Sequence, residues 1–241
     1  MTVPRRVPLT GLAISLAATA CQEIPRTYST AFAPGRQLYA DDFNREALGD
    51  DWNPTGDGAR IEDGHLVIDG VKNHPLWLRT PLPDDVRIEF DTWTDDEEGD
   101  IKVEVAGDGH ASTTSANYVA SGYVLVFGGW NNRLNVLARQ NEHGADRVSA
   151  GEPNVKPGRR YHFTIIRKGS ELVWDVDGRE LLRLDDPKPL RGDAHRHFAF
   201  SGWESEVVFD NLVISSLADA PGEVEVPRVG EVARGSAGET P

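Results

Sequence analysis

Polar and aromatic residues break the apolar pattern in one stretch of this 241-residue chain. Residues 122–142 read GYVLVFGGWNNRLNVLARQNE, so an apolar run leads to two glycines and Trp130, and polar residues then alternate with apolar ones. In a β-strand such polar residues share one face, because successive side chains point to opposite sides. Guanidinium and amide groups donate directional hydrogen bonds to sugar oxygens, and an indole can stack on a sugar ring. The predicted ligand-binding residues of this stretch are Trp130, Asn131, Arg133, Asn135 and Arg139.

The remaining positions of the same strand are apolar. Leu134, Val136 and Ala138 are expected to pack into the core, so that the polar face looks outward. A second interpretation stays open, in which the tryptophan covers an edge of the core and the arginines pair with surplus carboxylates. Trp77 and Trp203 stand in loop-like segments, and they fit sugar stacking as well as they fit a buried core.

Four carboxylates are candidates for acid, base or nucleophile in glycoside hydrolysis, which needs two such groups beside the scissile bond. Glu89 and Asp91 alternate on one face of the segment VRIEFDTW, where a solvated strand face is the competing interpretation. Glu142 follows the polar strand, and Glu204 follows a tryptophan. The sequence therefore leaves open whether the protein is an enzyme.

Cofactor chemistry has little support in the sequence. The histidines lack metal-binding spacing, and the chain contains no G-x-S-x-G motif, P-loop or dinucleotide fingerprint. The formal net charge of −14 without a basic cluster argues against nucleic acid as a partner.

Short alternating segments must position all these groups. Runs such as HLVIDG, IKVEVAGDG and YHFTIIRKGS are separated by turn residues, whereas helical periodicity is hard to find. Asp177-Gly178 lies between two such runs and suits a tight hairpin. Ten or more strands with short connections predict an all-β antiparallel sandwich or barrel.

The order of several motifs resembles that of the concanavalin A-like lectin/glucanase superfamily. Asp41-Asp42-Phe43, Trp52 and Gly64-His65-Leu66 match its opening, WDVDGRELLRLDDP its paired back strands, and VVFDNLVI its closing strand. The nearest subgroup is the laminin-G-like and 3-keto-disaccharide-hydrolase-like set of secreted proteins. The resemblance implies a two-sheet antiparallel jelly roll over residues 38–217, with a glycan lying across its concave sheet. It also implies that the two ends of the domain meet, and a structural calcium ion held there by Asp42 and Asp210 is the metal site that we expect.

The resemblance does not carry the catalytic mechanism of the glycanases with it. Those enzymes carry Glu-x-Asp-x(x)-Glu on one strand, and Glu89 and Asp91 begin this pattern here. Trp93 or Thr94 stands where the third acid, the proton donor, is required. Carbohydrate binding is therefore the favoured function, with a glycoside hydrolase or polysaccharide lyase as the alternative.

The first residues read as an export signal. Residues 1–20 combine two arginines with a short apolar run and end in Ala-Thr-Ala, directly before the only cysteine, Cys21. This arrangement resembles a bacterial lipobox, which implies lipidation of Cys21. Plain secretion after cleavage at the same bond is the alternative.

The segments that flank the predicted domain have a different composition. Residues 21–37 are expected to form a tether and residues 218–241 a disordered tail, since both are polar and rich in proline or glycine. Gln22 after the cysteine favours the outer membrane, and the lipid is expected to be the only membrane contact. We predict a monomer of the cell envelope that binds an oligosaccharide or polysaccharide. A structural or adhesion lipoprotein that binds another protein is the second alternative.

Overall fold

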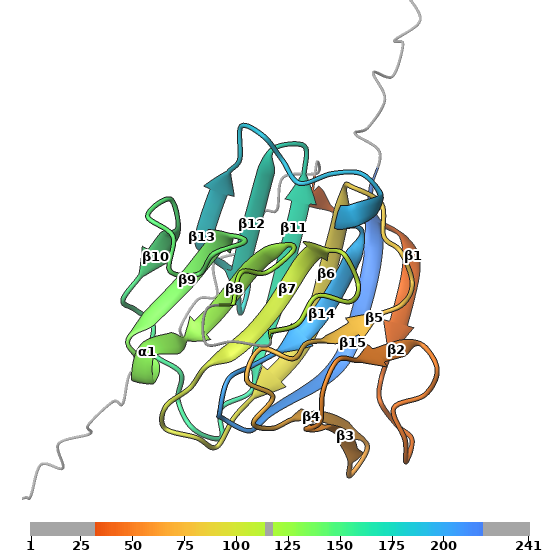
Figure 1. Ribbon diagram of the computed structural model, residues 1–241, viewed down its shortest axis with the longest axis vertical. Helices are drawn as coiled ribbons and strands as arrows, with labels where there is room; N and C mark the ends of the chain where they lie inside the picture. Colours follow the sequence, from red (N-terminus) through yellow and green to blue (C-terminus); the bar gives the residue numbers. More distant parts are fainter. Residues whose placement is uncertain (1–31, 114–117, 219–241) are drawn as a thin grey trace, which may run out of the picture.

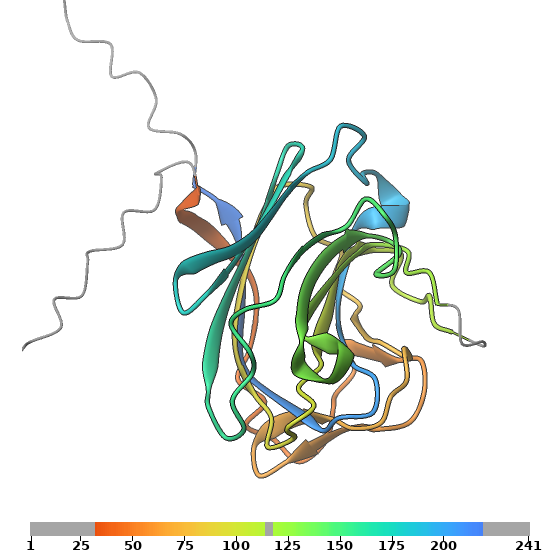
Figure 2. The same ribbon diagram turned by 90° about the vertical axis from the view of Figure 1, so that its left-hand side faces the viewer.

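The computed structural model describes residues 32–113 and 118–218. Within these residues the chain forms two antiparallel sheets that pack face to face (Figures 1 and 2). The predicted all-β, two-sheet jelly roll is therefore confirmed. The signal segment, Cys21 and nearly all of the predicted tail lie outside the described residues.

The larger sheet has the strand order β13-β12-β11-β6-β15-β4-β3, and β1 pairs with β15. Strand β1 begins at Pro34, so the structured domain starts four residues before the predicted boundary at residue 38. Its strands are β1 (Pro34–Asp41), β3 (Ala59–Glu62), β4 (His65–Ile68), β6 (Val86–Trp93), β11 (Tyr161–Lys168), β12 (Glu171–Val176), β13 (Arg179–Asp185) and β15 (Val207–Leu217).

The smaller sheet has the order β10-β9-β8-β7-β14-β5-β2. Two short helical turns accompany the strands, and α1 leads from β8 into β9 (Figure 1). The strands are β2 (Trp52–Pro54), β5 (Leu76–Leu78), β7 (Ile101–Gly107), β8 (Tyr123–Gly128), β9 (Leu134–Arg139), β10 (Val148–Ala150) and β14 (His197–Ser201), and the turns are α1 (Gly129–Asn132) and η2 (Asp193–His195).

Aromatic side chains from both sheets fill the space between them. Phe90 of the larger sheet contacts Phe200 of the smaller one at a ring distance of 5.5 Å, and Phe200 lies 4.3 Å from Phe209. Their burial removes a large apolar area from water, which is the main stabilising term of a sandwich. The Asp177-Gly178 hairpin predicted from the sequence joins β12 to β13, and both turn residues have positive φ, as a tight hairpin requires.

The Asp-Asp-Phe motif has a structural role at the end of β1. The Asp41 carboxylate accepts hydrogen bonds from the Trp52 indole, the Phe43 amide and the Arg45 guanidinium. These bonds fix the chain where it leaves β1 and hold the Trp52 ring against Phe200. The motif that carries the resemblance therefore anchors the core.

Candidate functional site

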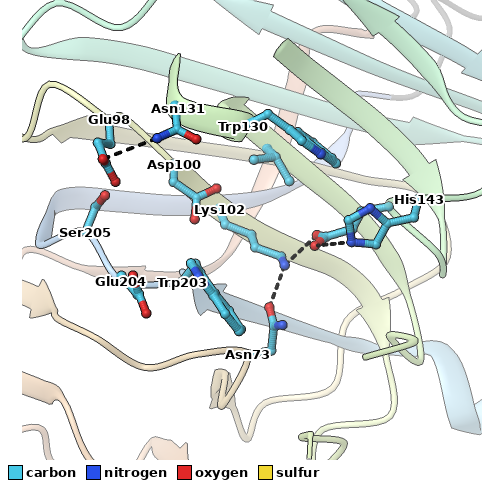
Figure 3. Close-up of a pocket in the computed structure, with 12 residues that line it drawn as sticks. Asn73, Glu98, Asp100, Lys102, Trp130, Asn131, His143, Trp203, Glu204 and Ser205 are labelled. Atoms are coloured by element: carbon cyan, nitrogen blue, oxygen red, sulfur yellow. Dashed lines mark hydrogen bonds and ion pairs between the residues drawn. The ribbon is translucent and has the colours of Figure 1, made fainter. Parts of the chain in front are cut away.

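A pocket of about 520 Å³ opens on the outer face of the smaller sheet, the face that points away from the larger sheet (Figure 3). Strand alternation builds its floor, because Ile101, Val103 and Val105 of β7 enter the core while Lys102 points outward. Turns and loops form the walls. The lining residues are Asn73, Glu98, Asp100, Lys102, Val126, Trp130, Asn131, Glu142, His143, Trp203, Glu204 and Ser205.

Lys102 is the central group of the floor, and only 2% of its surface is exposed. Its Nζ donates a hydrogen bond of 2.6 Å to Asn73 Oδ1 and lies 2.5 Å from Glu142 Oε2. The second contact is a short ion pair whose angles fall outside hydrogen-bond geometry. The ammonium also lies 5.9 Å from the ring centre of Tyr118. A buried charge needs such compensation, so these partners hold the lysine in one position.

Two carboxyl groups beside Lys102 titrate well above their usual range. Burial raises the pKa of Asp100 to about 6, with Lys102 opposing the shift and the charges of Glu142 and Asp96 adding to it. Burial also raises the pKa of Glu104 to about 7, and Tyr118 donates hydrogen bonds of 2.9 and 3.0 Å to its two oxygens. Asp100 lines the pocket, so it can exchange a proton with a ligand in the mildly acidic range around its pKa, and it is mainly ionised at neutral pH.

Two tryptophans stand at the pocket with much of their surface open to solvent. Trp130 is 37% exposed and Trp203 is 40% exposed. Figure 3 shows their indole groups on either side of Lys102. The Trp130 ring meets His143 edge-on at 5.3 Å, and the Arg147 guanidinium lies 5.0 Å from its centre. The pocket thus combines aromatic walls with a polar, charged floor.

A strained turn places Trp130 at the rim. Trp130, Asn131 and Asn132 all have φ near +55 to +58°, a region that side chains other than glycine rarely adopt. Asn132 holds the turn, since its Nδ2 donates to Val155 O at 2.7 Å and its Oδ1 accepts from Val155 N at 2.8 Å. Asn131 donates to Glu98 across the rim at 3.3 Å. The turn is therefore fixed by hydrogen bonds in a form that exposes the indole.

The predicted orientation of β9 is wrong. Leu134, Val136 and Ala138 lie on the outer face, where they pack with Tyr118, Ala120, Val124 and Val126. The alternate residue Leu137 enters the core between the sheets. The physical reason is the segment around Tyr118 and Ala120, which covers this part of the outer face and makes it apolar.

The polar residues of β9 consequently have structural partners. Asn135 is 1% exposed, accepts from Gly128 N at 2.9 Å and donates to Pro153 O at 3.0 Å. Arg139 forms an ion pair with Asp186 at 3.1 Å. Both side chains, and that of Arg133, belong to residues outside the pocket lining. The arginine-lined hollow that the sequence predicts is replaced by the pocket around Lys102.

We expect Asn135→Ala to lower the free energy of unfolding by about 2 kcal/mol, because it leaves the buried N–H of Gly128 without an acceptor and the Pro153 carbonyl without its donor. Urea denaturation measures this loss. Gln37→Ala is the control, because it removes an exposed amide side chain of β1, and it should change stability by less than about 0.5 kcal/mol. Equal stabilities of the two variants would contradict the structural role of Asn135.

The other sequence candidates divide between the pocket and the rest of the surface. Glu142 and Glu204 line the pocket, and Glu204 forms an ion pair with Lys72 at 3.1 Å. Trp77 does not, because it is fully buried beneath residues 107–111 and donates to Ala111 O at 2.9 Å. Stacking of Trp77 on a ligand is therefore contradicted by its burial.

Glu89 and Asp91 lie on the outer face of the larger sheet, away from the pocket. Burial acts to raise the pKa of Glu89, but His162 and Arg87 outweigh it and hold the pKa at about 2. Asp91 contacts His162 at 2.9 Å and accepts from Asn211 at 2.9 Å. Because both carboxylates are already bound by neighbouring side chains, they are better explained as members of a surface network of hydrogen bonds and ion pairs than as a catalytic pair.

The predicted calcium ligands have partners of their own. Asp42 is exposed and accepts a hydrogen bond from Asn44 N at 3.2 Å, while Asp210 pairs with Arg160 at 2.9 Å. Across residues 32–113 and 118–218, no group of three or more His, Cys, Asp or Glu side chains is placed to hold a metal. Among the same residues, no helix has the length and hydropathy to span a bilayer.

The candidates chosen from the sequence leave out several lining residues, among them Asn73, Asp100 and Lys102. A signal for two of them was present, because Asp100, Lys102 and Glu104 alternate with apolar residues along one segment. Asn73 gave no signal, since it meets Lys102 only through the fold.

Comparison with known proteins shows the fold. No family model and no curated protein matches the chain. Among solved structures, a Bacillus subtilis protein of unknown function with a galectin-like fold is 16% identical with a TM-score of 0.59, over 77% of this chain and 98% of that one. The carbohydrate binding module CBM66 from Bacillus subtilis is 13% identical with a TM-score of 0.53, over 69% and 96%. SCLam, a non-specific endo-β-1,3(4)-glucanase of family GH16, is 13% identical with a TM-score of 0.51, over 78% and 97%. These similarities support a concanavalin A-like jelly roll.

Proposed function

We propose that the protein binds carbohydrate in the pocket between Trp130 and Trp203. The observation that carries this proposal is the placement of the tryptophans: of the three exposed large apolar side chains in the described part of the chain, two line this pocket. A sugar offers apolar C–H faces for the indoles and hydroxyls for the amides and carboxylates between them. The carbohydrate-binding module and the glucanase of the same fold add support, although fold alone does not assign function.

Glycoside hydrolysis is the second candidate, and the carboxyl groups of the pocket favour it. Asp100, Glu142 and Glu204 all line the cavity, and the pKa of Asp100 near 6 suits a general acid. The ion pair between Glu142 and Lys102 opposes this candidate, because a carboxylate that is stabilised by a neighbouring ammonium is a weaker base and nucleophile. The resemblance to 3-keto-disaccharide hydrolases belongs with this alternative, as does a polysaccharide lyase.

The location that we propose rests on the sequence. Residues 1–20 act as the export signal, and Cys21 is then acylated. The lipid anchors the protein as a monomer in the cell envelope, preferably at the outer membrane, and plain secretion is the alternative. Its partner is then an extracytoplasmic oligosaccharide or polysaccharide. Adhesion to another protein is a weaker alternative, because a pocket with a charged floor differs from the flat apolar patch that such a contact favours.

Trp203→Ala and Trp130→Ala should each weaken glycan binding about tenfold, or ~1.4 kcal/mol, since each removes one stacking face. Glycan-array screening identifies the ligand, and calorimetry on the best ligand measures the loss. Trp93→Ala is the control, because Trp93 lies on the outer face of the other sheet beneath Arg160. Unchanged affinity in both pocket variants would refute the proposed site. A reducing-sugar assay on the same glycan tests hydrolysis, and activity that disappears in Asp100→Asn would favour the enzyme.

A further inference from the structure

Negative groups dominate the wall of the pocket. Its lining contains four carboxylates: Glu98, Asp100, Glu142 and Glu204. Lys102 is the single lysine or arginine among the described residues that line it. The carboxylates come from three separate segments, since Glu98 and Asp100 share the loop before β7, and the fold brings these segments together.

The positive charge of Lys102 is not offered to a ligand. The side chain is almost fully buried, and its ammonium is already bound to Asn73 and Glu142. Lys72 pairs with Glu204 from outside the lining, with 57% of its side chain exposed. A molecule that enters the pocket therefore meets Glu98 and Asp100, neither of which forms an ion pair with a lysine or arginine in the described part of the chain, while the Arg147 guanidinium lies over Trp130.

The surplus of negative charge has a cost that a cationic ligand would relieve. Asp100 and Glu142 line the same pocket, and while burial is the main cause of the raised pKa of Asp100, the like charges of Glu142 and Asp96 contribute to it. Carboxylates attract an ammonium group, and the face of Trp203 attracts it as well, whereas the Trp130 ring already has the Arg147 guanidinium 5.0 Å from its centre. The same carboxylates repel the negative groups of sulfated sugars and uronic acids, so the pocket can discriminate cationic glycans from anionic ones.

We propose that the pocket selects glycans that carry free, protonated amino groups, such as amino-sugar units without their acetyl groups. This inference rests on the proposed carbohydrate-binding function and names its ligand class. The ammonium sits at the carboxylates of Glu98 and Asp100, and the sugar rings lie against the tryptophans.

Binding of three β-1,4-linked hexasaccharides to the full chain tests the inference: a glucosamine hexamer, an N-acetylglucosamine hexamer and cellohexaose. At low ionic strength near neutral pH, the glucosamine hexamer should bind at least about tenfold more tightly than the other two. Added salt should reduce this advantage, because it screens the charge pairs. Equal binding of all three hexasaccharides would overturn the ligand class and leave the carbohydrate site standing.

Charge variants separate a local effect from the net charge of −14. Glu98→Gln should weaken the glucosamine hexamer about fivefold and leave cellohexaose unchanged. Glu46→Gln removes an exposed carboxylate outside the pocket and should change neither. If both variants weaken binding equally, the attraction is general and the inference fails. If glycans bind through Trp203 but the glucosamine hexamer does not, only the inference fails; if no glycan on the array binds, the proposed function fails with it.

Discussion

Lys102→Met is expected to lower the free energy of unfolding by about 3–5 kcal/mol, the usual effect of removing one partner from a buried ion pair. The Lys102 ammonium lies 2.5 Å from a carboxylate oxygen of Glu142. It also opposes the burial that raises the pKa values of Asp100 and Glu104. Without the ammonium these carboxyl groups face one another in a poorly solvated place. Chemical denaturation followed by tryptophan fluorescence measures the loss.

Lys72→Met is the matched control for this prediction. Lys72 stands at the same pocket, but its ion pair with Glu204 is open to solvent, so its removal should cost less than about 1 kcal/mol. The double variant Lys102→Met with Glu142→Gln should recover part of the stability, since it removes one of the uncompensated charges. A single Lys102 variant as stable as the Lys72 variant would show that the buried pair contributes little.

The fold was predictable because its signals are local. Alternating apolar residues and turns such as Asp177-Gly178 specify strands and hairpins without knowledge of the rest of the chain. The order of motifs from Asp41 to the final strand then indicated a jelly roll. Local sequence does not specify which face of a strand packs between the two sheets and which face points outward. In β9 both faces carry apolar residues, and only the cover of Tyr118 and Ala120 over the outer face decides which one enters the core.

The site was predictable only in part for the same reason. Trp130, Asn131, Trp203, Glu142 and Glu204 were candidates from the sequence, and all line the pocket. Their grouping around Lys102 was not visible, because Asn73 and Glu142 reach the lysine from distant parts of the sequence. Arg139 and Asn135 were misassigned, because arginine and asparagine suit a sugar and also suit a buried hydrogen bond, and the sequence does not distinguish these uses.

Stability is expected to fall as the pH rises from about 5 to 8, and Glu104 is the main cause. Its pKa is about 7 in the folded protein against an ordinary value of 4.5, so the folded state binds more protons than the unfolded state between these values. The free energy of unfolding therefore decreases with pH across this window, by roughly 3 kcal/mol for a shift of this size. Asp100 acts in the same direction from its own ordinary value up to about 6.

Urea denaturation at several pH values measures this dependence, and Glu104→Gln isolates its cause. The glutamine carbonyl still accepts from Tyr118 but has no proton to lose, so the variant should lose much less stability between pH 5 and 8 than the parent. Glu46→Gln should retain the full dependence, since its carboxylate is exposed. If the Glu104 and Glu46 variants follow the same curve as the parent, Glu104 is ionised in the folded protein at neutral pH. Glu104 would then add a negative charge beneath the pocket at neutral pH, and Lys102 would have to compensate for that charge as well as for Glu142.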